Sequence, residues 1–320
     1  MLSADEARGR ALPDDNLVLP FRTVASGVGG RVVRLGSVVD TILSRHAYPE
    51  PVSHALGESL ALVSMLGAAM KEQSKFILQT KSDGPLGFLV ADCESPGKVR
   101  GYASFDKADA ALAAERGRGD QGVLLGKGHL AMTIDPGEGD RYQGIVPLER
   151  QTLAEAADTY FCNSVQLPTF MRLAVARHYG PTGGNGERGW RWRAGGLLIQ
   201  RLAREEREVA EGDDNPDEDE DWNRVLHLAS TVEDHELLDP MLSPERLLYR
   251  LFHEEGVRVT PSTALAAACR CSRERIAMYL EQLGARELAD LREPDGGLTA
   301  TCEFCSRQYK FAAGEFAGGA

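Results

Sequence analysis

The sequence predicts an α+β protein with a large mixed sheet-and-helix N-terminal domain, a helical linker region and a small C-terminal four-cysteine zinc domain. Its 320 residues exceed what one small core needs. Strand and helix patterns come in runs without regular alternation, which argues against a doubly wound sheet. Four of the six cysteines lie in two close pairs near the C-terminus. We therefore expect a core domain over 15–193, a linker region over 194–255 and a zinc domain over 256–312.

The first elements of the core are expected to be two helices. Apolar residues recur at helical spacing over 35–46 and again over 53–71. A hairpin should follow, because β-rich runs flank the turn residues 82–85. The same reasoning predicts three further strands, at 99–105, 129–135 and 170–178.

An acidic tract interrupts the chain at 204–221. Eleven acidic residues stand there against only Arg204 and Arg207, with almost nothing apolar to bury. We interpret 205–221 as a disordered or solvated linker, and an inserted loop without a specific role is favoured over a binding tail.

Two amphipathic helices are predicted between this tract and the cysteines. The first carries an apolar stripe from Trp222 to Val232. The second begins at Ser243-Pro244, a capping residue followed by a first-turn proline. Both helices are expected to pack onto a neighbouring domain, which leaves room for a second state in which that packing is released.

Charge and hydropathy exclude several classes of function. The net charge of −12 repels a phosphate backbone, so nucleic acid is not an expected partner. No run of eighteen apolar residues is present and the first ten residues lack a secretory signal, so we expect a cytoplasmic protein that does not enter a membrane. No spaced set of acids, bases and nucleophiles indicates an enzyme.

The cysteines carry the strongest signal. Cys93 and Cys162 are isolated, and lone intracellular cysteines are typically small buried hydrophobes. The other four form a C-x-C and a C-x-x-C pair. Four thiolates match the tetrahedral preference of zinc and leave no open position for a catalytic water, so one structural or regulatory zinc per chain is expected. Its candidate ligands are Cys269, Cys271, Cys302 and Cys305.

Such a site can act as a switch. Residues 256–311 are few for an independent core, and structural zinc contributes roughly 10 to 16 kcal/mol of folding free energy in small domains. Each pair is close enough in sequence to form its own disulfide, which would eject the metal. The tiny loops so closed would restore little stability.

Spacing alone leaves two other interpretations open. The site can be a permanent zinc ribbon in an adaptor or nucleic-acid module. Alternatively, Cys302 and Cys305 can form a thioredoxin-like redox pair, although the expected βαβ setting is not evident.

Segments along the whole chain resemble the 33 kDa chaperonins, a family of redox-regulated holdases. The likeness covers residues 15–311 and includes, in the expected order, LLGKGHLAMTID, YQGIVPL, YFCNSVQLPT, AGGLLIQ, LFHEEGVRV, CRCSRER and CEFCSRQYKF. Two departures stand out. Val165 replaces a usual acidic residue, and the acidic tract is longer than expected.

The resemblance implies an ATP-independent chaperone of the stress response. Reduced, zinc-bound protein would be inactive. Oxidation would form disulfides within each pair, Cys269 with Cys271 and Cys302 with Cys305, and would unfold the switch and the adjoining linker. The activated form, a homodimer, would bind unfolded or oxidatively damaged client proteins.

Overall fold

The computed structural model describes residues 15–107, 121–181, 187–202 and 218–316. The chain divides between Ala267 and Ala268 into a larger and a smaller compact unit. Both contain helices and antiparallel strands, which confirms the α+β prediction. The three-part division at 193 and 255 concerns roles and stays a prediction. No helix in the described ranges is long and apolar enough to cross a membrane.

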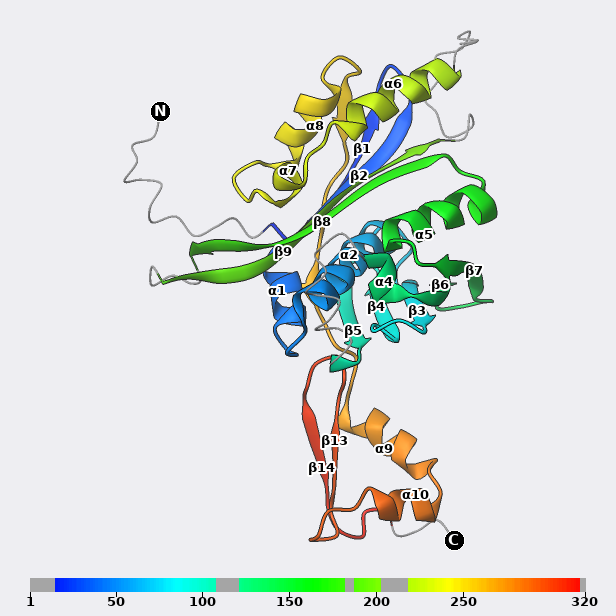
Figure 1. Cartoon of the computed structure of the whole chain (residues 1–320), viewed down its shortest axis with the longest axis vertical. Helices are drawn as coiled ribbons and strands as arrows, with labels where there is room; N and C mark the ends of the chain where they lie inside the picture. The colour runs from blue at the N-terminus through cyan, green and yellow to red at the C-terminus, as the bar shows by residue number, and fades with distance from the viewer. Residues whose placement is uncertain (1–14, 108–120, 182–186, 203–217, 317–320) are drawn as a thin grey trace. The chain divides into compact units, whose positions relative to one another are not determined.

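The first sheet of the larger unit has six strands in the order β10-β1-β2-β9-β8, with β11 also paired to β1. All its pairings are antiparallel. Figure 1 shows β8 and β9 as a long hairpin that runs along this sheet. The strands are β1 (Leu17–Thr23), β2 (Val28–Leu35), β8 (Thr169–Pro181), β9 (Arg188–Arg201), β10 (Val257–Val259) and β11 (Thr263–Ala264).

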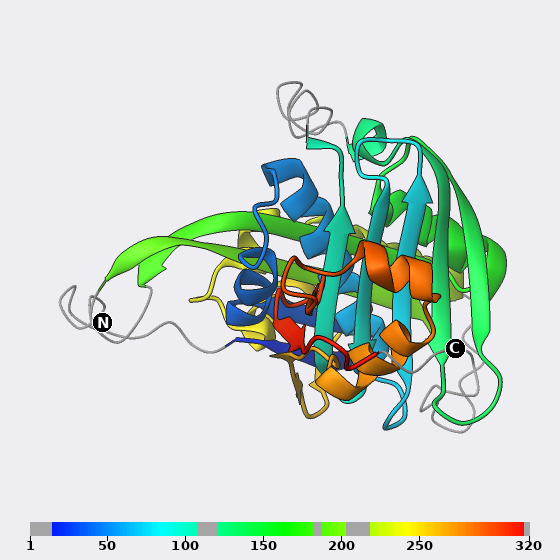
Figure 2. The same cartoon turned by 90° about the horizontal axis from the view of Figure 1, so that it is seen from below.

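The second sheet has the order β12-β5-β4-β3-β6-β7 and faces the viewer in Figure 2. The predicted hairpin at 82–85 is confirmed, since it joins β3 to β4, and the three further predicted strands correspond to β5, β6 and β8. The strands are β3 (Lys75–Ser82), β4 (Phe88–Glu94), β5 (Lys98–Ser104), β6 (Lys127–Asp135), β7 (Tyr142–Glu149) and β12 (Ala266–Ala267).

Helix α2 (Glu50–Gly67) lies between the two sheets (Figure 1). It is buried nearly all round, and small residues let both sheets approach it. A Cβ on Gly57 would lie 2.9 Å from Val175 of β8, and one on Gly101 of β5 would lie 2.9 Å from Leu56. Beside α2 lie α1 (Ser37–Leu43), α4 (Gln121–Leu125), α5 (Leu153–Tyr160) and the π-helical turn η1 (Phe161–Val165).

The other face of the first sheet is covered by the helices that follow the acidic tract (Figure 1). Both predicted helices are present, and Ser243 caps the second by accepting a hydrogen bond from the Arg246 backbone N–H. The Phe252 ring stacks on that of Phe21 at 5.6 Å. We define the linker helices as α6 (Glu218–Ser230), α7 (Asp234–Leu238) and α8 (Pro244–Phe252).

The predicted linker region, 194–255, contains strand as well as helix. Strand β9 continues to Arg201, so the first residues of this region belong to the first sheet. The tract 205–221 is predicted to be disordered or solvated. Disorder is wrong for 218–221, which form the first turn of α6, whereas Asp219 and Glu220 are exposed to solvent as predicted. Acidic side chains are stabilising there because they face the positive end of the helix dipole. Residues 203–217 lie outside the described ranges.

A buried arginine fastens the loop around α7 to the sheet. The Arg34 residue on β2 is only 1% exposed. Its guanidinium donates to the carbonyl oxygens of Glu236, Asp239 and Leu242 at 2.8, 2.9 and 3.0 Å. Burial lowers the pKa of Arg34 to about 10, and none of the described carboxylates forms an ion pair with it. The attraction between the positive guanidinium of Arg34 and the three backbone carbonyl dipoles therefore holds the loop. Arg193 adds a bond of 2.8 Å to the Leu238 carbonyl.

Arg34→Ala should lower the free energy of unfolding of the larger unit by about 3 kcal/mol, because three partly buried carbonyls lose their donor. Urea titration can measure this, since all three tryptophans (Trp190, Trp192 and Trp222) lie in this unit. Arg172→Ala is the matched control. Arg172 also links the sheet to α7, through an exposed ion pair with Asp234. Its replacement by Ala should lower the free energy of unfolding by less than about 1 kcal/mol. Equal losses in the two variants would contradict this account.

A second polar network connects α2, α4 and α5. The Gln121 amide donates to the Glu58 carboxyl at 2.8 Å and accepts from the Leu153 backbone N–H at 2.9 Å. Burial raises the pKa of Glu58 to about 7, despite the opposing hydrogen bond from Gln121. The carboxyl is therefore partly protonated at neutral pH.

The stability of the larger unit should fall as pH rises from about 4.5 to about 7, because the unfolded chain gives up the Glu58 proton before the folded one does. Glu58→Gln keeps an acceptor for Gln121 and removes this dependence. It should be more stable than the parent above pH 7, by at most about 3 kcal/mol. Urea titrations at pH 5 and pH 8 test this, with the exposed Glu245→Gln as control. Parallel pH profiles for parent and Glu58→Gln would contradict it.

Candidate metal centre

The smaller unit has little core of its own. It consists of α9 (Arg273–Glu281), α10 (Ala285–Asp290) and a hairpin of β13 (Leu298–Thr301) and β14 (Gln308–Phe311). Only four apolar side chains are buried in its described part, those of Leu280, Leu288, Leu298 and Phe311. So small an apolar cluster contributes little folding free energy, so another source of stability is expected in this unit.

The C-x-x-C pair sits in the turn that joins β13 to β14. The Cys302 N–H donates to the Arg307 carbonyl at 2.9 Å and extends the ladder of the hairpin by one bond. The Ser306 N–H donates a hydrogen bond to the Cys302 carbonyl at 2.7 Å, and Ser306 adopts a positive φ of 57°. This tight turn brings both thiols to the same end of the hairpin.

The C-x-C pair precedes α9. Ser272 follows Cys271 directly and caps this helix by accepting a hydrogen bond from the Arg275 N–H at 3.2 Å. The Arg275 guanidinium in turn donates to the Arg270 carbonyl, between the two cysteines, at 2.9 Å. The helix start thus fixes the backbone that carries the first two thiols.

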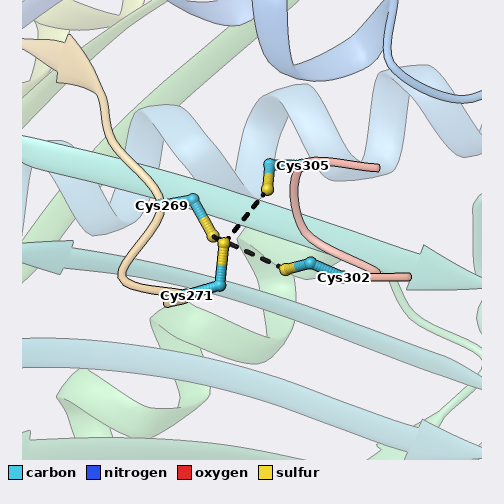
Figure 3. A group of neighbouring side chains, drawn as sticks. All are labelled: Cys269, Cys271, Cys302 and Cys305. Atoms are coloured by element: carbon cyan, nitrogen blue, oxygen red, sulfur yellow. Dashed lines mark hydrogen bonds between the residues drawn. The ribbon is translucent and has the colours of Figure 1, made fainter. Parts of the chain in front are cut away.

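The four predicted cysteines come together in space, pointing toward one another from two segments (Figure 3). Their Sγ atoms all lie within 4.8 Å of one another. The Cys271 Sγ is 3.3 Å from those of Cys269 and Cys305, and the Cys269 Sγ is 3.6 Å from that of Cys302. Tetrahedral zinc holds thiolates at about 2.3 Å, so its sulfurs stand about 3.8 Å apart. The set therefore fits one metal ion.

Electrostatics in the cluster favour a cation. Burial raises the pKa of Cys302 to about 12 and also raises that of Cys305. Burial acts in the same direction on Cys271, but hydrogen bonds from Tyr309 and the neighbouring thiols outweigh it and lower that pKa to about 7. Four crowded thiols cannot all ionise beside one another, because each thiolate opposes the next; a bound divalent cation removes that opposition.

Tyr309 is a participant that the sequence did not reveal. Its hydroxyl donates to the Cys271 Sγ at 3.2 Å, and this contact raises the pKa of Tyr309. Strand β14 pairs with β13 in the hairpin, with Tyr309 opposite Ala300, and this register brings Tyr309 to the cluster. Hydrogen bonds to ligand atoms orient them and tune a metal site. No local spacing signal links Tyr309 to the cysteines.

The two isolated cysteines differ from each other. Cys93 on β4 is fully buried, as predicted. The prediction for Cys162 is wrong, because this residue lies in η1 and is exposed. Phe161 is the buried residue of that turn.

Comparison with known proteins agrees with these features. The family model described as Hsp33 protein matches residues 16–312. The 33 kDa chaperonin of Caulobacter vibrioides is 43% identical over 92% of this chain and 94% of its own length. That of Ectopseudomonas mendocina is 37% identical, over 91% and 90%.

A solved structure shares the fold. The 33 kDa chaperonin of Thermotoga maritima matches with a TM-score of 0.73 at 23% identity, covering 94% of this chain and 97% of that one. The family match spans nearly the whole chain and includes the cysteine cluster. This chain belongs to the Hsp33 family of 33 kDa chaperonins.

Proposed function

We propose that this chain is an ATP-independent holdase, a chaperone of the cytoplasm that is inactive when reduced and zinc-bound and is activated by oxidation. The observation that carries the proposal is the cluster of four Sγ atoms within 4.8 Å, in a unit with only four buried apolar side chains in its described part. Membership of the Hsp33 family supports chaperone activity. Control of that activity by oxidation is the part of the proposal that goes beyond family membership.

Zinc is the metal that the ligand set favours. Soft thiolates select zinc over magnesium or calcium, and a closed shell of four gives it tetrahedral coordination without a site for substrate. Cys269, Cys271, Cys302 and Cys305 would each supply one thiolate. The metal would hold the start of α9 to the β13–β14 turn.

Removal of zinc should unfold the smaller unit. We expect a chelator to collapse the dispersed amide signals of 268–316 in an NMR spectrum, because roughly 10 kcal/mol of binding energy is lost from a unit with little core. Cys302→Ser should hold zinc well below one per chain in metal analysis, and the exposed Cys162→Ser should hold one. Dispersed signals in the chelated protein would contradict this prediction.

Oxidation of the thiols can convert the resting, zinc-bound state into the active one. One hydrogen peroxide takes two electrons and two protons from a pair of thiols, which leaves one disulfide and two waters. The Cys269 and Cys271 sulfurs are already 3.3 Å apart. We propose one disulfide within each pair, Cys269 with Cys271 and Cys302 with Cys305. A disulfide sulfur is a poor zinc ligand, so the metal leaves and the unit loses its stabiliser.

The linker helices are the proposed client surface. Their buried faces are strongly apolar, and the chain runs from α8 through β10, β11 and β12 directly to Cys269. An unfolded switch would loosen this segment and expose an apolar patch, which binds unfolded or oxidatively damaged proteins. The apolar residues concerned on the helices are Val225, Ala229, Leu237, Leu247, Leu248, Leu251 and Phe252. We propose that the activated form is a homodimer.

Peroxide with mild heat should release zinc, consume four thiols per chain and create suppression of client aggregation, all on one time course. Cys302→Ser should suppress aggregation before oxidant is added, because its switch is already unfolded. Cys162→Ser should behave as the parent does. The measurements are zinc release with a chromophoric chelator, thiol counting and light scattering of a heat-denatured client.

Other outcomes of this experiment would identify other functions. A permanent zinc-ribbon adaptor would lose its function on metal release. A thiol–disulfide oxidoreductase would turn over in an insulin-reduction assay. Oxidised, metal-free protein that protected no client would exclude the holdase.

A further inference from the structure

A cavity of about 380 Å³ opens on the first sheet, where β10, β1, β2 and β9 run side by side. Such a volume suits a small molecule rather than a single water or ion. Among the described residues that line it none is acidic and three are arginines, Arg22, Arg31 and Arg258. Its other walls include the apolar side chains of Leu198 and Leu202 and the amide of Gln200.

The strand register gathers the three arginines on one face. Arg22 of β1 is directly opposite Arg258 of β10 on one side and Gly29 of β2 on the other. Arg31 is two residues beyond Gly29 and therefore diagonal to Arg22. Opposite residues on antiparallel strands stand about 5 Å apart and diagonal ones about 7 to 8 Å, so the three guanidinium groups can reach one ligand.

This face is not the one that the linker helices cover. Side chains alternate along a strand, and the neighbours of these residues, Phe21, Val28 and Val257, pack with the linker helices on the opposite face. A ligand can therefore occupy the cavity while the linker helices stay in place.

Two of the arginines in the cavity, Arg22 and Arg31, have no charge partner among the described residues. Like charges directly opposite each other destabilise a sheet, and here Arg22 faces Arg258. The side chains of Arg22 and Arg31 make no ion pair or hydrogen bond with described residues, although partial burial lowers the pKa of Arg31. Gly29 separates Arg22 from Gln200 in the register, and the Leu202 side chain lies over it, since a Cβ on Gly29 would lie 2.9 Å from Leu202.

We propose that this cavity is a binding site for a phosphate-bearing anion, held by Arg22, Arg31 and Arg258. A phosphoryl group offers up to two charges and three acceptor oxygens, so one group can bridge the arginines on adjacent strands. The Gln200 amide can donate a further hydrogen bond. The volume suits an oligophosphate or a phosphate ester better than a single phosphate. This site is separate from the metal centre and does not depend on the proposed chaperone mechanism.

Isothermal titration calorimetry on the reduced full chain in low salt tests the site. The probes are sodium tripolyphosphate, ATP and inorganic phosphate, with zinc content checked after each titration. We expect one tripolyphosphate or ATP per chain and weaker binding of inorganic phosphate. Arg22→Gln and Arg31→Gln should each raise Kd at least tenfold with unchanged melting temperature. Arg246→Gln, an exposed arginine of α8, is the matched control and should change Kd less than twofold.

The comparison of probes distinguishes the source of the phosphate. Tighter binding of ATP indicates a nucleotide, and tighter binding of tripolyphosphate a free oligophosphate; both support the site. Equal weakening in all three variants would show unspecific attraction and overturn it, as would absence of binding. Binding that appears only after the acidic residues of 205–217 are replaced by Asn and Gln would also overturn it. The ligand would then be the chain's own acidic tract, which begins three residues beyond Leu202.

Discussion

The larger unit is built around one contact, the packing of α2 between two sheets. A helix in that position cannot be amphipathic, and α2 accordingly buries apolar and small residues nearly all round. Glycines at Gly57 and Gly101 allow the sheets to approach it closely. Helix α2 buries the apolar side chains on one face of the first sheet. The apolar side chains on the opposite face must be buried by another element. The linker helices supply this cover, so the resting fold depends on a segment that lies late in the chain.

The two units draw their stability from different sources. The larger one has an extended apolar core, which no single ligand needs to complete. In the smaller one, the described part has only four buried apolar side chains and a cluster of four thiols. A change confined to sulfur chemistry therefore affects the small unit far more than the large one. In the proposed function this difference makes oxidation a local trigger and keeps the apolar core of the larger unit folded.

Local patterns in the sequence predicted the parts of the structure that depend on local rules. Cysteine spacing anticipated the cluster, Ser243-Pro244 the start of α8, and the turn at 82–85 the hairpin of β3 and β4. Contacts set by register or by distant packing were not predictable in this way. Tyr309 reaches Cys271 only through the hairpin, and Arg34 meets a loop two hundred residues away. Strand β9 is buried on both faces from Trp192 to Ile199, so this stretch lacks the alternation that marks a strand.

The way in which Arg34 holds the loop has a consequence for how the linker can vary. Its three hydrogen bonds go to backbone carbonyls, which every amino acid carries. Substitutions at Glu236, Asp239 or Leu242 leave those acceptors in place, so the fastening tolerates many sequences as long as the backbone keeps its path. Relatives can therefore differ in the side chains of this loop while Arg34 holds its backbone to the sheet in the same way, so the surface of the loop can change in evolution without loss of its attachment.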